Sequence, residues 1–264
     1  MSNETAAREL AGSFRRDHGL DLAPIKDMFE LLHLTVGVDV LSVKADEAEH
    51  GLSMTDTASG RVVIAVATTV HPMRQRSSVA HELGHVLAGD LERDLDGQPG
   101  ERSPSEIQAD AFARHLLLPL DAVRVRLEGR FPIELADVSD LVQEFEVSPT
   151  VAAIQMREAG HIHAETCSDW MGMSTRVLAA TYGWLSQYQA LVKASSQPHA
   201  PQALMARAAA AYQGGMLGIG ELAFWYGQPA TELMEELTPV TPPEPFEDDM
   251  GVGVPLFPSS KPPV

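Results

Sequence analysis

The chain has 264 residues, enough for one large domain or two modest ones, and 44% of them are apolar, as in ordinary globular proteins. Its 37 acidic residues against 19 basic ones give a formal net charge of −18. Because Lys and Arg supply the attraction to phosphate backbones and anionic lipids, this charge argues against direct binding of nucleic acid or membrane. A basic protein partner is compatible with it and would be met faster.

The first half of the chain alternates helix and strand signals. Apolar residues at helical spacing, with Gly19 after the first run and Pro24 opening the second, predict helices at 6–18 and 24–34. Three stretches rich in β-branched residues predict strands at 36–43, 52–56 and 62–67. The turn-forming residues 57–60 predict a hairpin between the last two. The third strand is almost continuously apolar, so it should be central and covered on both faces.

Proline and serine mark the helices that follow. Pro72 begins a helix that runs to about Gly89, and 91–102 is predicted to be a surface loop. Ser103 is a helix cap with Pro and Glu at the first and third positions after it, and this helix should end near Leu118. The remaining helical stretches are 121–127, 135–145, 149–159, 168–194 and 202–237.

These elements predict an α+β protein with a small β-sheet packed on helices. We divide it into a first domain at 1–160 with a helical extension, an all-helical region at 161–238, and a Pro-rich acidic tail at 239–264 that we expect to be disordered.

The sequence His81-Glu82-Leu83-Gly84-His85 is an HExxH motif inside a predicted helix. Its two histidines lie about 40° apart around the helix and one turn apart, so both imidazoles can reach one ion. Apolar residues occupy the opposite face, which allows the helix to bury one side and present the histidines to a cleft: Val79, Leu83, Val86 and Leu87.

A catalytic zinc site needs a third protein ligand, and Glu106 on the next long helix is the best candidate. Asp110, one turn after Glu106, is well placed to accept a hydrogen bond from the free nitrogen of a zinc-bound histidine. Glu82 projects beside the histidine pair and could take a proton from the attacking water. An oxyanion donor is also expected, and the candidates stay open: His161, His163, Tyr182 and Tyr188. His115 is a poor candidate, because it lies about 180° around its helix from Glu106.

The stretch from Gln75 to His85, with its arginine and AHELGH sequence, is followed by an ExxADxFA…LLxP pattern from Glu106 to Pro119. Together they resemble the ImmA/IrrE family of bacterial and phage metallopeptidases, and the resemblance covers about 5–160. It implies a zincin-like fold, Zn²⁺ or alternatively Mn²⁺ at His81, His85 and Glu106, and Glu82 as general base. It also implies a protein substrate, typically a helix-turn-helix repressor that is cleaved at one site during stress or mobile-element induction.

Two other functions remain open. The protein could be a non-catalytic, metal-containing regulator that binds a transcription factor, although such a regulator has no need of Glu82. It could also bind DNA through a helix-turn-helix-like segment at 135–160, but Arg157 is the only basic residue of the would-be recognition helix.

The single cysteine, Cys167, excludes an internal disulfide and suits a reducing compartment. The first ten residues hold no apolar stretch typical of a signal peptide, and the longest apolar run is too short for a membrane span. We therefore expect a cytoplasmic protein.

Overall fold

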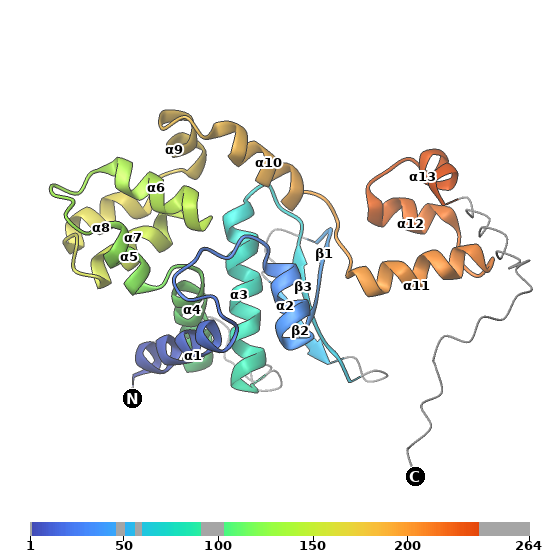
Figure 1. Ribbon diagram of the computed structural model, residues 1–264, viewed down its shortest axis with the longest axis horizontal. Helices are drawn as coiled ribbons and strands as arrows, with labels where there is room; N and C mark the ends of the chain where they lie inside the picture. Colours follow the sequence, from blue (N-terminus) through green and yellow to red (C-terminus); the bar gives the residue numbers. More distant parts are fainter. Residues whose placement is uncertain (1, 46–50, 56–59, 91–102, 238–264) are drawn as a thin grey trace, which may run out of the picture.

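The computed structural model describes residues 2–45, 51–55, 60–90 and 103–237 (Figure 1). The predicted loop 91–102, the tail 239–264 and most of the turn 57–60 lie outside the described residues. A three-stranded sheet is packed among helices, which confirms the α+β prediction.

The elements in chain order are α1 (Asn3–Asp17), α2 (Met28–Val36), β1 (Asp39–Val43), β2 (Leu52–Thr55), β3 (Val62–Ala67), α3 (Pro72–Ala88), α4 (Pro104–Leu117), α5 (Leu120–Arg126), α6 (Leu135–Phe145), α7 (Pro149–Glu158), α8 (Ala164–Met171), α9 (Thr175–Thr181), α10 (Leu185–Ser195), α11 (Gln202–Gln213), α12 (Ile219–Tyr226) and α13 (Ala230–Glu236).

The start of α2 differs from the prediction: it begins at Met28 and not at Pro24. The carbonyls of Ile25 and of the residue after it accept hydrogen bonds from the buried guanidinium of Arg76. The amides four residues later, which would donate to these carbonyls in a helix, donate to Asp27 instead. Asp27 caps the helix instead, because its carboxylate accepts from two amides of the first turn.

The sheet has the strand order β1-β3-β2, which confirms that the third strand is central. β2 and β3 pair antiparallel, as the predicted hairpin requires, and β1 and β3 pair parallel. Ile64 and Val66 are buried, but the alternate residues of β3 are only half-buried, so the expected cover is complete on one face alone. The outer side of β1 is bridged at Ser42 by the backbone of His199, which leaves β2 as the outer strand at the other edge of the described sheet.

Helices α3 and α4 form as predicted. α3 begins at Pro72 and ends at Gly89, whose left-handed backbone (φ 70°) closes the helix. α4 begins after Ser103, whose hydroxyl accepts from the amide of Glu106. α3 packs against the sheet on one side and against α4 on the other, so it lies at the centre of the molecule (Figure 1).

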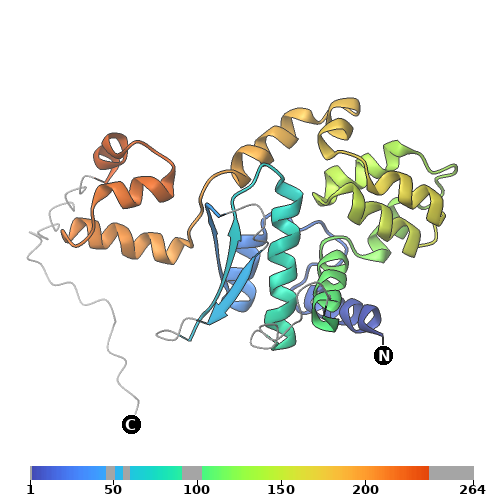
Figure 2. The same ribbon diagram turned by 180° about the vertical axis from the view of Figure 1, so that it is seen from behind.

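Two hydrophobic cores hold the described residues together. The larger core extends from α1 to α10, and Leu178 of α9 and Tyr188 of α10 belong to it. The smaller core lies within α11–α13, which stand on the other side of the sheet from α3 (Figures 1 and 2). The helical region after residue 160 is thus shared between two cores. None of the described helices is long and apolar enough to cross a membrane.

Candidate metal centre

The two histidines of the HExxH motif face each other on α3. Their ring centroids are 4.8 Å apart, and the Nε2 atoms of His81 and His85 are 3.1 Å apart. Val79 and Leu83 on the far side of the helix are fully buried, as the predicted apolar face requires. The helix therefore packs its apolar side into the core and directs both imidazoles to one point.

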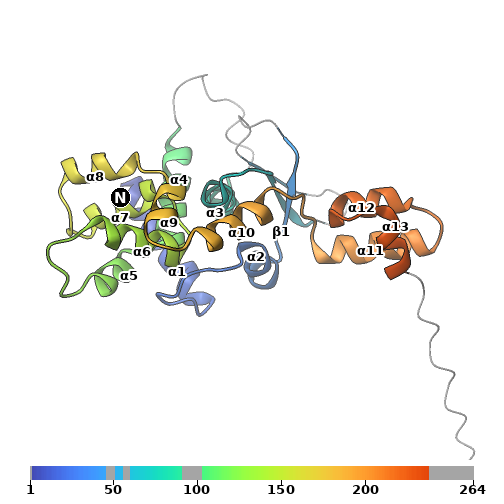
Figure 3. The same ribbon diagram turned by 90° about the horizontal axis from the view of Figure 1, so that it is seen from above.

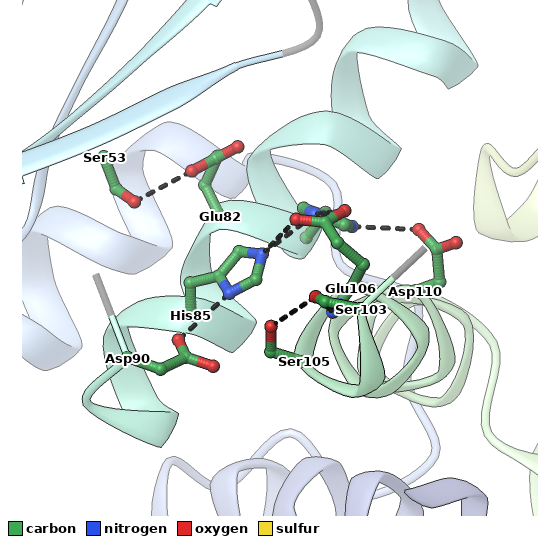
Figure 4. A network of polar contacts seen from close by, with 9 residues as sticks. Ser53, Glu82, His85, Asp90, Ser103, Ser105, Glu106 and Asp110 are labelled. Carbon is green, nitrogen blue, oxygen red and sulfur yellow. Dashed lines mark hydrogen bonds and ion pairs between the residues drawn. The ribbon is translucent and has the colours of Figure 1, made fainter. Parts of the chain in front are cut away.

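Glu106 of α4 completes the group (Figure 4). Its Oε2 lies 3.3 Å from Nε2 of His81, and its Oε1 lies 3.3 Å from Nε2 of His85. The structure thus brings together the three predicted ligands. The side chain of His85 is 7% exposed and that of Glu106 is 36% exposed, so the group is open to solvent on the side of Glu106.

The two helices approach closely because α3 has a glycine where they touch. A Cβ added at Gly84 would lie 3.1 Å from Cδ1 of Phe112 and 3.3 Å from Cα of Ala109, both on α4. These distances are shorter than ordinary van der Waals contact, so a side chain at this position would require α4 to give way by a few tenths of an ångström. Gly84, the fourth residue of the motif, hence keeps Glu106 within reach of the histidines.

Both histidines are oriented by carboxylates on their far side. Nδ1 of His81 lies 2.9 Å from Asp110, as predicted, and Nδ1 of His85 lies 3.0 Å from Asp90. Each carboxylate can only accept, so this network assigns the ring proton to Nδ1 and leaves a lone pair on each Nε2. Three polar atoms then converge that can each offer a lone pair, an arrangement that a positive charge between them, a proton or a metal ion, would stabilise.

Electrostatics at the site favour a cation. Burial alone would lower the pKa of His81, but the hydrogen bond from its ring to Asp110 and the negative charges of Asp110, Glu106 and Glu82 raise that pKa overall. The surroundings that stabilise an added proton on the ring would equally stabilise a metal ion beside it.

Zinc fits this set of donors. Zn²⁺ binds imidazole and carboxylate at about 2.0–2.2 Å in tetrahedral geometry, which sets neighbouring ligand atoms about 3.3 Å apart. The separations of 3.1 Å and 3.3 Å among His81, His85 and Glu106 match this value. Two nitrogen donors and one carboxylate suit zinc better than Mn²⁺, which prefers oxygen ligands in octahedral geometry.

Glu82 lies beside the histidines and is itself held in place (Figure 4). Its Oε2 accepts a 2.8 Å hydrogen bond from the hydroxyl of Ser53 on β2. Gly51, just before that strand, passes so close that a Cβ there would lie 2.9 Å from Cγ and Oε1 of Glu82. The carboxylate is buried and fixed between the helix and the outer strand, as a positioned proton acceptor should be.

Sequence reasoning missed Asp90, Ser53 and Gly51. Asp90 had one usable signal, since it follows the helix-ending Gly89 and lies five residues after His85. Ser53 and Gly51 had none, because their contact with Glu82 depends on how the sheet packs on α3.

The four predicted oxyanion candidates lie outside the hydrogen-bond network of the site. No hydrogen bond within the described residues joins His161, His163, Tyr182 or Tyr188 to Glu82 or to the three ligands. His115 points away from the site, as expected: its Nε2 donates to Glu4 and its Nδ1 accepts from Gln155.

Comparison with known proteins agrees with this geometry. The family model of the IrrE N-terminal-like domain, Peptidase M78, matches residues 35–157, a range that contains β1 to α4 and every residue of the metal centre. No curated protein matches the chain. Residues 35–157 therefore form an IrrE N-terminal-like domain of the ImmA/IrrE family, which makes this a metallopeptidase-like protein.

Proposed function

We propose that this protein is a zinc-dependent endopeptidase that cleaves a protein substrate. His81, His85 and Glu106 hold the zinc, and Glu82 is the general base. The observation that carries the proposal is the convergence of three lone-pair donors, each imidazole oriented by its own carboxylate, with a fourth carboxylate fixed beside them. A site built only to hold structural zinc is typically closed by a fourth protein ligand and does not need Glu82.

The residues divide the chemistry among them. When bound, zinc polarises a carbonyl and lowers the pKa of water toward neutrality. Glu82 accepts the proton from the attacking water and delivers it to the leaving amine. Ser53 donates its hydroxyl hydrogen to Glu82 and holds one carboxylate oxygen, so that the other remains for proton transfer.

The strand beside Glu82 supports a peptide substrate. β2 is the outer strand of the described sheet, and such an edge can add an extended peptide through backbone hydrogen bonds. Leu52 and Met54 on this strand are 56% and 46% exposed. Because they alternate with Ser53, their side chains lie on the face of the strand that points away from Glu82. A substrate paired with β2 would run directly past Glu82.

We infer that the substrate is a helix-turn-helix repressor and that its cleavage releases transcription in a stress or mobile-element response. The family resemblance and the charge support this substrate, since DNA-binding domains are basic and a chain of net charge −18 attracts them. We place the reaction in the cytoplasm and expect the enzyme to contact the repressor rather than DNA. The basic residue of α7, Arg157, is paired with Glu158, and the turn before α7 is packed against the body through a salt bridge from Arg76 to Glu146.

The test compares wild type with Glu82→Gln and His81→Ala. Metal analysis of purified protein should give about one zinc per chain for wild type and Glu82→Gln, and much less for His81→Ala. In cells, new protein N-termini should appear with wild type and be absent with Glu82→Gln, which identifies the substrate directly.

A wild-type protein that binds no zinc after zinc is added back would refute the metal centre. Zinc binding with the same N-termini in wild type and Glu82→Gln cells would instead favour the alternative, a metal-containing regulator that binds its partner without cutting it.

A further inference from the structure

A cavity of about 670 Å³ lies at the N-terminal end of α3, away from the metal centre. Its walls come from the first turns of α3, α7 and α9 and from one side of α10, which runs across the end of α3 (Figure 3). Arg74, on this end of α3, is about 10 Å along the helix from His81 by the helical rise per residue. Because α9 and α10 follow residue 157, half of the cavity lies outside the part of the chain that matches the peptidase family.

The polar lining of this cavity is basic, against the charge of the chain as a whole. The basic side chains that line it are His71, Arg74 and Arg176. Among the described residues no Asp or Glu lines it, although acidic residues outnumber basic ones 37 to 19 in the sequence. Arg176 forms no salt bridge with another described residue, and the hydroxyl of Ser174 beside it makes no capping bond to α9. An arginine and hydroxyl groups around a basic hollow are donors suited to a carboxylate or phosphate.

The remaining wall is apolar and firmly held. Met73 and Tyr188 are buried members of the main core, and the ring of Tyr188 packs edge-on against Trp184 at 6.2 Å between centroids. Met173 and Val192 line the same side and are half-buried. Small-molecule sites are typically cavities of 300–1,000 Å³ with apolar walls and a few directed polar groups, and this cavity has that form.

We propose that this cavity binds a small organic anion, a phosphate ester or a carboxylate whose aromatic or aliphatic group packs against Tyr188 and Met173 while Arg176 holds the charge. The ligand would touch the first turn of the metal-bearing helix and tie the family domain to α9 and α10. It would therefore be an effector of this chain and not a substrate of the metal centre.

The test is calorimetric titration of the full chain with phenyl phosphate and with benzoate, which separates the phosphate from the carboxylate as the anionic group. The matched variants are Arg176→Gln and Arg124→Gln. Both remove one exposed helical arginine, but Arg124 is paired with Asp121 and does not line the cavity. We expect saturable binding of one of the two anions, weakened about tenfold by Arg176→Gln and unchanged by Arg124→Gln. Benzyl alcohol, which lacks the charge, should not bind.

Several results would overturn the proposal. Failure of both anions to saturate at concentrations up to about 10 mM, where dissociation constants above 1 mM are still measurable, would refute it. Equal weakening by Arg176→Gln and Arg124→Gln would show that the anion responds to net charge and not to this cavity. Binding that Arg176→Gln leaves unchanged would show that the ligand binds elsewhere. Binding of benzyl alcohol as tight as that of the anions would show that the negative charge is not recognised. Because binding is measured directly, none of these outcomes depends on whether the chain cleaves a protein.

Discussion

The contact between α3 and α4 at Gly84 provides the most direct test of how the metal centre is assembled. Replacing Gly84 by Ala adds one methyl group between the helices, where it would lie 3.1 Å from Cδ1 of Phe112 and 3.3 Å from Cα of Ala109. The ring of Phe112 can move slightly, but the backbone of Ala109 can yield only if α4 shifts as a unit. The substitution should therefore widen the gap between the histidines and Glu106.

The expected change in the free energy of unfolding follows from two opposing effects. Glycine in the middle of a helix is less favourable than alanine by about 1 kcal/mol, so the substitution gains that much from the backbone. Overpacking a close interface costs about 1–3 kcal/mol. The free energy of unfolding should thus fall by about 0–2 kcal/mol, where the helix effect alone predicts a rise.

Gly12 in α1 is the matched control. It is also inside a helix, but a Cβ there would meet only Nη1 of Arg16, the end of a flexible side chain, at 3.2 Å. Gly12→Ala should stabilise the protein by about 1 kcal/mol, so the two variants should differ by about 1–3 kcal/mol.

Urea unfolding of the metal-free protein would measure this difference, and competition with a chelator would measure zinc affinity. Zinc should bind more weakly to Gly84→Ala and equally well to Gly12→Ala, because only the first moves Glu106. If Gly84→Ala is as stable as Gly12→Ala and keeps its zinc affinity, the close contact does not control the metal centre and the reasoning is wrong.

Three further predictions concern other parts of the site and of the fold. Asp90→Ala should weaken zinc binding by about 10–100-fold, because His85 loses the acceptor that orients it; unchanged affinity in a chelator competition would count against this role. Gly51→Ala should reduce peptide turnover and leave zinc content intact, since the new methyl group would displace Glu82 and no metal ligand; loss of zinc would indicate wider damage. Burial lowers the pKa of His115, although the negative charge beside it opposes this shift, so its contribution to stability is present above pH 6.5 and is lost as the pH falls through the lower folded-state pKa. His115→Gln should flatten the pH dependence of urea unfolding below pH 6.5, and an unaltered slope there would refute this assignment.

Much of the site follows from spacing along the chain. The i, i+4 spacing of His81 and His85 places them on one helical face whatever the rest of the fold, and the same spacing relates Glu106 to Asp110. Gly89 ends α3 and Ser103 begins α4. Both act through capping of the backbone, which depends on only a few neighbouring residues. For these reasons most elements, and the three residues that meet as candidate ligands, could be predicted from the sequence.

The remaining features depend on contacts between distant segments, and only the tertiary structure decides them. Pro24 has the local chemistry of a helix start, but Arg76 on another helix donates to the carbonyls that follow it, and the helix begins after Asp27 instead. Ser53 reaches Glu82 because the hairpin packs on α3, and the basic cavity exists because α10 crosses the end of that helix. Local spacing fixed which side chains share a face; the distances that make them a site arise from packing, which couples residues far apart in the chain.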